Sequence, residues 1–172
     1  MNWKRILFFV VIGIWGQNKG MAQKLPYSVP EEKRVRVIVS TDAANEVDDA
    51  YYILHALLTP QFDVRGVVAA HFGGRRPNDL QLSYEECQRV LHHSGLDGKV
   101  ALLKGAARKM TDENTPVASE GAELIVREAL SDDMHPLYVL CGGPLTDVAS
   151  AILLHPEIAD RLTVVWTGGA PH

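Results

Sequence analysis

Short apolar runs alternate with amphipathic stretches from residue 35 onward. The runs are rich in β-branched residues, as is typical of strands in a parallel sheet. These predicted strands cover residues 35–40, 64–70, 100–103, 137–141 and 162–166. Between them, apolar residues at helical spacing predict helices over residues 48–58, 83–93, 118–130 and 144–154. The pattern predicts an α/β domain with an open, mainly parallel sheet and helices on both faces.

Two helix starts carry local signals. Ser83 is followed three residues later by Glu86, which has the form of a capping box and predicts a helix beginning at Ser83. Pro144 is favoured in the first turn of a helix, where its missing N–H leaves no hydrogen bond unmade. Both signals agree with the apolar spacing that follows them.

The N-terminal residues have the pattern of a secretory signal peptide. Lys4 and Arg5 precede an uncharged apolar run over residues 6–16, and small residues precede Gln23. The run is shorter than the roughly 20 residues that a membrane-spanning helix needs. We therefore expect residues 1–22 to be a cleaved signal peptide, residues 23–34 a linker and residues 35–172 the domain. The mature protein is then exported, to the periplasm or the medium, and does not remain in the membrane. An uncleaved membrane anchor is the alternative.

The composition argues against nucleic acid and anionic membrane surfaces as partners. The chain is 47% apolar and 22% charged with a formal net charge of −4, so it offers no basic face for nucleic acid. Cys87 and Cys141 lie on different predicted elements and lack the spacing of a zinc site. We expect two separate buried thiols. The composition leaves the oligomeric state open, a homo-oligomer included.

Four carboxylates are crowded into the segment between the first strand and the first helix: Asp42, Glu46, Asp48 and Asp49. This segment follows the carboxyl end of a strand, where ligands bind in open α/β sheets. A helix N-terminus stabilises a nearby negative charge by about 0.3–1 kcal/mol, which accounts for only one of the four. A hard cation such as Ca²⁺ or Mg²⁺, which prefers oxygen ligands, would account for the others. An acidic N-cap with solvated neighbours is the alternative.

Three sequence blocks resemble one known family. Ser40 to Asp49 reads STDAANEVDD and resembles the motif D-x-D-P-G-x-D-D. Cys141 to Asp147 reads CGGPLTD and resembles T-G-P-L-T-N before a helix. Val164 to Ala170 reads VVWTGGA and resembles a strand ending in M-G-G. In this order, over about residues 35 to 170, the blocks resemble the inosine-uridine-type nucleoside hydrolases.

The resemblance implies a Rossmann-like core, one bound Ca²⁺ and hydrolysis of the N-glycosidic bond of ribonucleosides to base plus ribose by a Ca²⁺-bound water. It implies that Asp42 is a Ca²⁺ ligand and the base for the attacking water. It also implies Asp49 and the backbone carbonyl of Gly142 as metal ligands, and Asp48 as an acceptor for a ribose hydroxyl. The substrate would be a small ribonucleoside.

The chain departs from the family pattern in the first block. Ser40 replaces the first Asp of the motif, and the loop before Asp48 is longer, with Ala-Ala-Asn-Glu in place of Pro-Gly. Asn45 in this loop is a candidate substrate contact, and the role of Glu46 is open. His71 falls where the family has an Asn, so it is either a substrate contact or a solvated loop histidine.

The sequence leaves three functions open. We expect an exported, Ca²⁺-dependent nucleoside hydrolase of which this chain is an N-terminal portion, because the resemblance places a further metal carboxylate and an acid candidate beyond residue 172. The alternatives are a non-catalytic nucleoside- or sugar-binding module on the same scaffold, and an inactive truncated product. The basic loop over residues 73–80 is expected near the mouth of the site, as a surface loop or a substrate contact.

Overall fold

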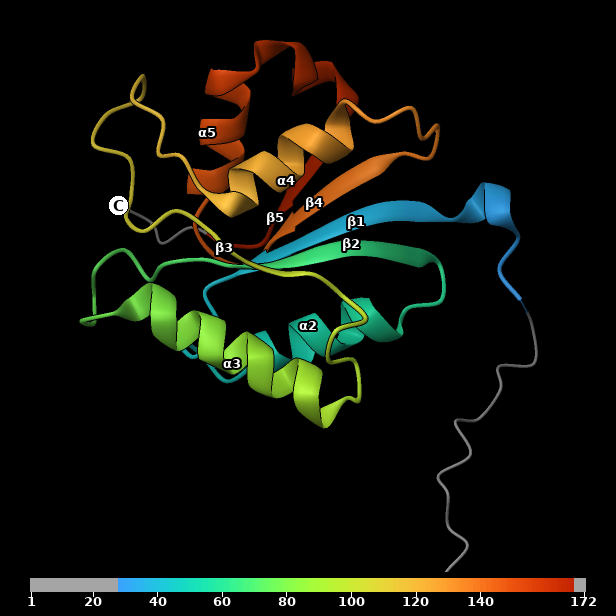
Figure 1. The fold of residues 1–172 in the computed structure, drawn as a ribbon, viewed down its shortest axis with the longest axis horizontal. Helices are drawn as coiled ribbons and strands as arrows, with labels where there is room; N and C mark the ends of the chain where they lie inside the picture. The colour runs from blue at the N-terminus through green and yellow to red at the C-terminus, as the bar shows by residue number, and fades with distance from the viewer. Residues whose placement is uncertain (1–27, 169–172) are drawn as a thin grey trace, which may run out of the picture.

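A five-stranded, all-parallel sheet forms the centre of the computed structural model, which describes residues 28–168 (Figure 1). The strand order is β3-β2-β1-β4-β5. The strands are β1 (Val35–Thr41), β2 (Phe62–Ala69), β3 (Leu102–Lys104), β4 (Leu137–Cys141) and β5 (Thr163–Trp166). The predicted signal peptide and residues 23–27 of the predicted linker lie outside the described residues.

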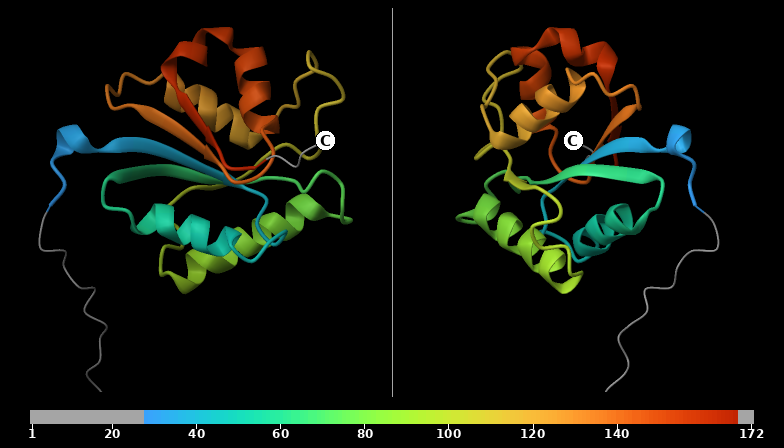
Figure 2. Two further views of the ribbon diagram at one scale, coloured as in Figure 1. Left: turned by 180° about the vertical axis from the view of Figure 1, so that it is seen from behind. Right: turned by 45° about the vertical axis from the view of Figure 1, so that its right-hand side comes forward.

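Helices cover both faces of the sheet, as the sequence pattern predicts. The α-helices are α2 (Asp49–Leu58), α3 (Asp79–His93), α4 (Glu120–Ala129) and α5 (Thr146–Leu154), and the 3₁₀-helices are η2 (Glu31–Lys33) and η3 (Pro156–Arg161). Figures 1 and 2 show α2 and α3 on one face, and α4 and α5 on the other. No helix in this described part is long and apolar enough to cross a lipid bilayer.

Side chains on the two faces of β1 pack into two separate hydrophobic cores. Val37 and Val39 are fully buried with Ile53 of α2, whereas Ile38 is fully buried with Leu124 of α4. This alternation follows from the two-residue period of a strand. Burying a side chain of this size contributes about 1.5–3 kcal/mol to the free energy of unfolding. A strand buried on both sides is typical of a parallel sheet and explains the unbroken apolar run.

The sheet reverses its direction of growth between β1 and β4. After β1 the chain adds β2 and β3 on one side, and it then crosses back to place β4 on the other side of β1. Ser40 pairs with Cys141 in the β1–β4 register, and the Gly142 N–H donates to the Ser40 carbonyl over 2.8 Å. The loops that follow β1 and β4 therefore start side by side and diverge, which leaves a crevice at the carboxyl edge.

Three predicted helix starts are wrong by two to four residues, and one of them is α4, which begins at Glu120 instead of residue 118. Helix α3 begins at Asp79 instead of Ser83. Ser83 is buried and donates its hydroxyl to the Thr41 carbonyl over 3.2 Å, so it anchors the helix to β1 and does not cap it. Helix α5 begins at Thr146, two residues after Pro144. Pro144 instead belongs to the loop that leads from β4 into the helix.

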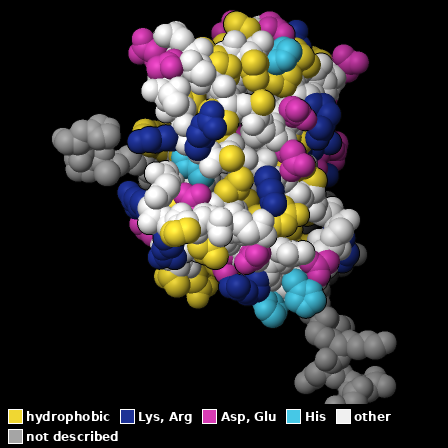
Figure 3. Space-filling model, turned by 60° about the vertical axis from the view of Figure 1, so that its left-hand side comes forward, with side chains coloured by type: hydrophobic (Ala, Val, Ile, Leu, Met, Phe, Trp, Pro, Cys, Tyr) yellow, Lys and Arg dark blue, Asp and Glu magenta, His cyan; other side chains and the backbone are white. Residues whose placement is uncertain are grey.

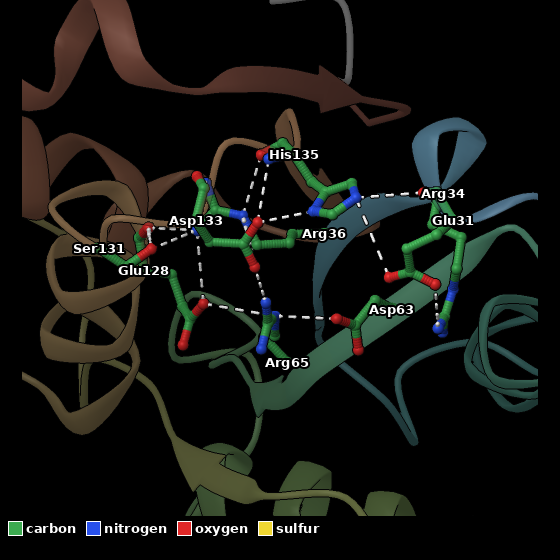
Figure 4. A network of polar contacts seen from close by, with 9 residues as sticks. All are labelled: Glu31, Arg34, Arg36, Asp63, Arg65, Glu128, Ser131, Asp133 and His135. Carbon is green, nitrogen blue, oxygen red and sulfur yellow. Dashed lines mark hydrogen bonds and ion pairs between the residues drawn. The ribbon is translucent and has the colours of Figure 1, made fainter.

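A buried arginine organises the amino edge of the sheet (Figure 4). Arg36 of β1 is 4% exposed and donates to the backbone carbonyls of Glu128, Asp133 and His135. Arg65 of β2 forms ion pairs with the side chains of Glu128 and Asp133. These contacts join two strands to the segment between α4 and β4. The polar network lies at the edge of the sheet opposite the crevice, so it stabilises the fold and takes no part in the site.

Strand β5 forms one border of the described sheet and is exposed. Its residues Val164, Val165 and Trp166 have exposed fractions of 36%, 41% and 48%. The indole N–H of Trp166 donates to the Gly143 carbonyl over 3.0 Å, which ties the end of β5 to the loop after β4. Cys87 and Cys141 are buried free thiols, as expected.

Candidate functional site

A cavity of about 620 Å³ opens at the carboxyl edge of the sheet, where β1 and β4 diverge. Segments that follow each of the five strands contribute to its lining. Every site residue proposed from the sequence lines this cavity, namely Asp42, Asn45, Asp48, Asp49, His71 and Gly142. The fold thus gathers residues from three separate loops around one space.

Asp49 is held at the bottom of this crevice by two protein donors. It is the first residue of α2 and is 7% exposed. The Thr41 hydroxyl donates to Asp49 Oδ1 over 2.5 Å, and the Glu46 backbone N–H donates to Asp49 Oδ2 over 3.2 Å. The carboxylate is therefore fixed in place by the end of β1 and by the loop before α2. Each oxygen keeps a further lone pair for another partner.

Asp42 lies beside Asp49 and against the loop after β4. Burial, and next the negative charge of Asp49, raise the pKa of Asp42 to about 6. The Asn45 side-chain amide donates to Asp42 Oδ2 over 3.1 Å. A Cβ added at Gly143 would lie 2.7 Å from Asp42 Oδ1, so the glycine is what allows the two loops to approach. Asn45 thus supports Asp42, a role that the sequence did not indicate.

Asp48 and Glu46 differ from these two because their side chains are exposed. Asp48 occupies the N-cap position of α2, but its side chain makes no capping hydrogen bond. Capping therefore does not explain this carboxylate, although both residues line the cavity. Their exposure leaves them free to contact a ligand.

His71 is not a solvated loop residue. It is 1% exposed, and its Nδ1 accepts the Gly73 backbone N–H over 2.8 Å. Burial lowers the pKa of His71, so the neutral ring carries its proton on Nε2 and donates it to Thr146 Oγ1 over 2.9 Å. Both ring nitrogens are thus used within the protein. The Thr146 hydroxyl, which also lines the cavity, keeps its own proton for a ligand.

A buried aspartate shapes the loop after β2. Asp79 is 7% exposed and accepts the backbone N–H groups of Phe72 at 2.9 Å, Gly74 at 2.8 Å and Leu80 at 2.7 Å. Gly74 has a φ of 82°, which favours glycine. The basic loop predicted near the mouth is therefore anchored at its base. Sequence reasoning missed Asp79, and its position just before an apolar-periodic stretch was the one signal for it.

A second buried aspartate lies behind the cavity. Asp147 is 1% exposed, and its Oδ1 accepts from the Ala106 N–H at 2.8 Å and the Ser119 hydroxyl at 2.5 Å. Its Oδ2 is buried without a partner in the described structure, and burial raises the pKa of this carboxyl. A Cβ added at Gly105 would lie 2.5 Å from Oδ2, so the neighbouring loop packs directly on it. Asp147 thus joins α5 to the loops after β3.

The crevice offers oxygen atoms, which are the type of ligand that a hard cation prefers. Asp42 and Asp49 supply carboxylate oxygens, and Gly142 lies beside them with a backbone carbonyl. Ca²⁺ takes roughly six to eight oxygen ligands. Among residues 28–168, no cluster of three or more Asp, Glu, His or Cys side chains is arranged to hold a metal ion. The fit is therefore that of a partial ligand set built on two carboxylates.

The fold and the crevice define an α/β protein with an acidic site at the point where the strand order reverses. The sequence model of the family "Inosine-uridine preferring nucleoside hydrolase" matches residues 37–172. The chain therefore belongs to this family. A comparison with curated proteins found no match.

Solved structures share the fold at low sequence identity. An inosine-guanosine nucleoside hydrolase is 20% identical, with a TM-score of 0.61 over 79% of this chain and 50% of that one. A purine-preferring ribonucleoside hydrolase from Gardnerella vaginalis is 18% identical, with a TM-score of 0.61 over 78% and 49%. An inosine-uridine preferring nucleoside hydrolase from Bacillus anthracis is 19% identical, with a TM-score of 0.56 over 79% and 51%. The chain thus spans about half the length of these structures.

Proposed function

We propose that the protein binds a ribonucleoside in the crevice and hydrolyses its N-glycosidic bond to base plus ribose. The observation that carries this proposal is the convergence of Asp42 and Asp49 with the Gly142–Gly143 loop where β1 and β4 diverge. Membership of the family supports it. Ribonucleosides as a class are the substrates that this membership implies.

The chemistry explains why carboxylates would be used. Breaking an N-glycosidic bond builds positive charge on the ribose, whereas the bound nucleoside is neutral. Carboxylates such as Asp42 and Asp48 therefore stabilise the transition state more than the ground state. Asp42 would act as the general base that takes a proton from the attacking water. Asp48, which is exposed to the cavity, would accept a hydrogen bond from a ribose hydroxyl.

Asp42, Asp49 and the Gly142 carbonyl would hold a Ca²⁺ ion. When bound, such an ion would orient the ribose hydroxyls and lower the pKa of a water. The protein's own contribution is to fix these groups, because Thr41 holds Asp49 and Asn45 holds Asp42. We also propose, from the N-terminal sequence pattern, that the protein is exported.

A second candidate is a nucleoside- or sugar-binding module without catalysis. Two observations favour it. Ser40 stands where the family motif begins with Asp, and the described residues supply only a partial set of metal ligands. Binding and turnover must therefore be measured separately.

The test combines base release with binding. The full chain is incubated with inosine, uridine or adenosine in the presence of Ca²⁺, and free base is followed by chromatography. Asp42→Asn is expected to lower turnover by about 10²–10⁴-fold, the usual loss when a general base is removed. Asp112→Asn is the matched control, because Asp112 is exposed and does not line the cavity.

Base release that survives Asp42→Asn would show that another group is the base. Binding of a nucleoside without any release would support the binding module. Absence of both would contradict a nucleoside site in this chain.

A further inference from the structure

The charges of the cavity are divided between two sides. The carboxylates Asp42, Asp48 and Asp49 come from the segment between β1 and α2, whereas Arg75 and Lys109 come from the loops after β2 and β3. Since β2 and β3 are successive neighbours on one side of β1, these two cations belong to that side of the crevice. Figure 3 turns the carboxyl edge toward the viewer and shows Lys and Arg side chains spread over this face, with acidic and histidine side chains among them.

Neither of these cations is paired with a carboxylate in the part of the chain that the structure describes. Among residues 28–168, Arg75 and Lys109 have no carboxylate oxygen within 4.0 Å and donate no side-chain hydrogen bond. Arg34, Arg65 and Arg89 each form an ion pair with a nearby carboxylate. Two unpaired cations lining one cavity are available to a negatively charged ligand.

The backbone around Arg75 is anchored although its side chain is free. On one side, the Gly74 N–H donates to buried Asp79 Oδ2 over 2.8 Å. On the other side, the Arg76 guanidinium donates to the Ala44 carbonyl over 3.3 Å. Anchoring on both sides reduces the entropy that Arg75 would lose on binding a ligand.

We infer that the cavity binds a ribonucleoside 5′-phosphate more tightly than the neutral nucleoside, with the phosphate against Arg75 and Lys109. This inference rests on the proposed function. In ribose the 5′ carbon projects from the face of the ring opposite to the 2′ and 3′ hydroxyls. A sugar whose hydroxyls face Asp42 and Asp48 therefore directs its 5′ substituent away from those carboxylates.

The same charges exclude the opposite orientation. A phosphate placed beside Asp42 and Asp49 would be repelled, whereas one placed between a guanidinium and an ammonium forms charge-assisted hydrogen bonds. The pattern of charge thus selects one orientation of a ligand that carries hydroxyls at one end and an anion at the other.

The test compares inosine 5′-monophosphate with inosine by isothermal titration calorimetry, using the full chain in the presence of Ca²⁺. Because both cations are exposed, the phosphate is expected to tighten binding by about tenfold. The double variant Arg75→Ala, Lys109→Ala is expected to abolish this difference, and Arg75→Lys, Lys109→Arg to restore most of it. The control is Arg108→Ala, Arg127→Ala, which makes the same change of net charge at exposed residues outside the cavity lining.

Each other outcome overturns a stated claim. Equal affinities for the two ligands, or a difference that persists in the double variant, would show the inference wrong while nucleoside binding stands. Inorganic phosphate that binds as tightly as inosine 5′-monophosphate would assign the cations to a free anion and contradict the nucleotide. Failure of both inosine and inosine 5′-monophosphate to bind the unaltered chain would overturn the proposed function itself.

Discussion

Thr41 donates its hydroxyl to Asp49 Oδ1 over 2.5 Å, and this bond joins the last residue of β1 to the first residue of α2. Both residues are buried, so the carboxylate depends on protein donors for its hydrogen bonds. The loop between them carries Asp42 and Asn45 into the cavity. The bond therefore fixes the acidic side of the site.

Thr41→Val removes this donor while keeping the shape of the side chain. A buried acceptor that loses its partner costs about 1–3 kcal/mol, so we expect the free energy of unfolding to fall by that amount. Urea denaturation measures the loss, and Thr41→Ser is the control because it keeps the hydroxyl. A Thr41→Val protein as stable as the Thr41→Ser protein would show that the bond contributes nothing.

Gly143→Ala is expected to push Asp42 out of place. The new Cβ would lie 2.7 Å from Asp42 Oδ1 and 2.9 Å from its backbone N, closer than real Cβ contacts allow. Overpacking of this kind costs about 1–3 kcal/mol and should weaken Ca²⁺ and nucleoside binding together. Gly142→Ala serves as the graded comparison, since its Cβ would meet neighbouring side chains at 3.1 Å.

Calorimetric titration of both variants with Ca²⁺ measures the effect. The expected order of affinity is unaltered protein, then Gly142→Ala, then Gly143→Ala. An unchanged affinity in Gly143→Ala would mean that the loop after β4 can shift without disturbing Asp42.

Asp147→Asn is expected to change how stability depends on pH. Burial raises the pKa of Asp147 in the folded protein, so the folded state holds its proton more tightly than the unfolded state does. Stability from this group is therefore lost as the pH rises above its unfolded value of about 3.9. The neutral amide of Asn lacks this dependence, so the variant should gain stability relative to the unaltered protein as the pH increases.

Urea midpoints of the two proteins, measured from acidic to neutral pH, give this comparison directly. Glu113→Gln is a suitable control at an exposed carboxylate. A loss of stability by the Asp147 variant relative to the unaltered protein as the pH rises would contradict a raised pKa.

His71 is expected to stay neutral, with its proton on Nε2, across the physiological pH range. Its lowered pKa favours the neutral ring. The bond from the Gly73 N–H to Nδ1 then favours the tautomer with the proton on Nε2. Nitrogen-15 chemical shifts of the imidazole ring report the tautomer without any need for activity. A ring protonated on Nδ1 at neutral pH would be incompatible with the Gly73 contact.

The sequence pattern predicted β1 well because this strand is buried on both faces. Val37, Ile38 and Val39 form an unbroken apolar run for that reason, and their run was enough to locate β1. The start of α3 was predicted wrongly because Ser83 is used in a tertiary contact with Thr41, which local pattern does not reveal.

The site was predicted less completely than the fold. Asp42 and Asp49 stood out by their spacing, and the structure brings both to the cavity. The roles of Asn45 and Thr146 depend on hydrogen bonds to Asp42 and His71 that exist only once the loops are placed. The predicted signal peptide lies outside the described residues, so export stays a prediction.

The pairing of β1 with β4 has a consequence for how this protein is made. Most of the domain separates the two strands in sequence. The ribosome therefore releases the acidic segment after β1, which contains Asp42 and Asp49, long before the Gly142–Gly143 loop after β4. Contacts between distant parts of a chain form slowly, since the intervening loop must first be closed. The crevice is therefore expected to be completed late in folding, and any event that detaches β4 from β1 would remove it at once.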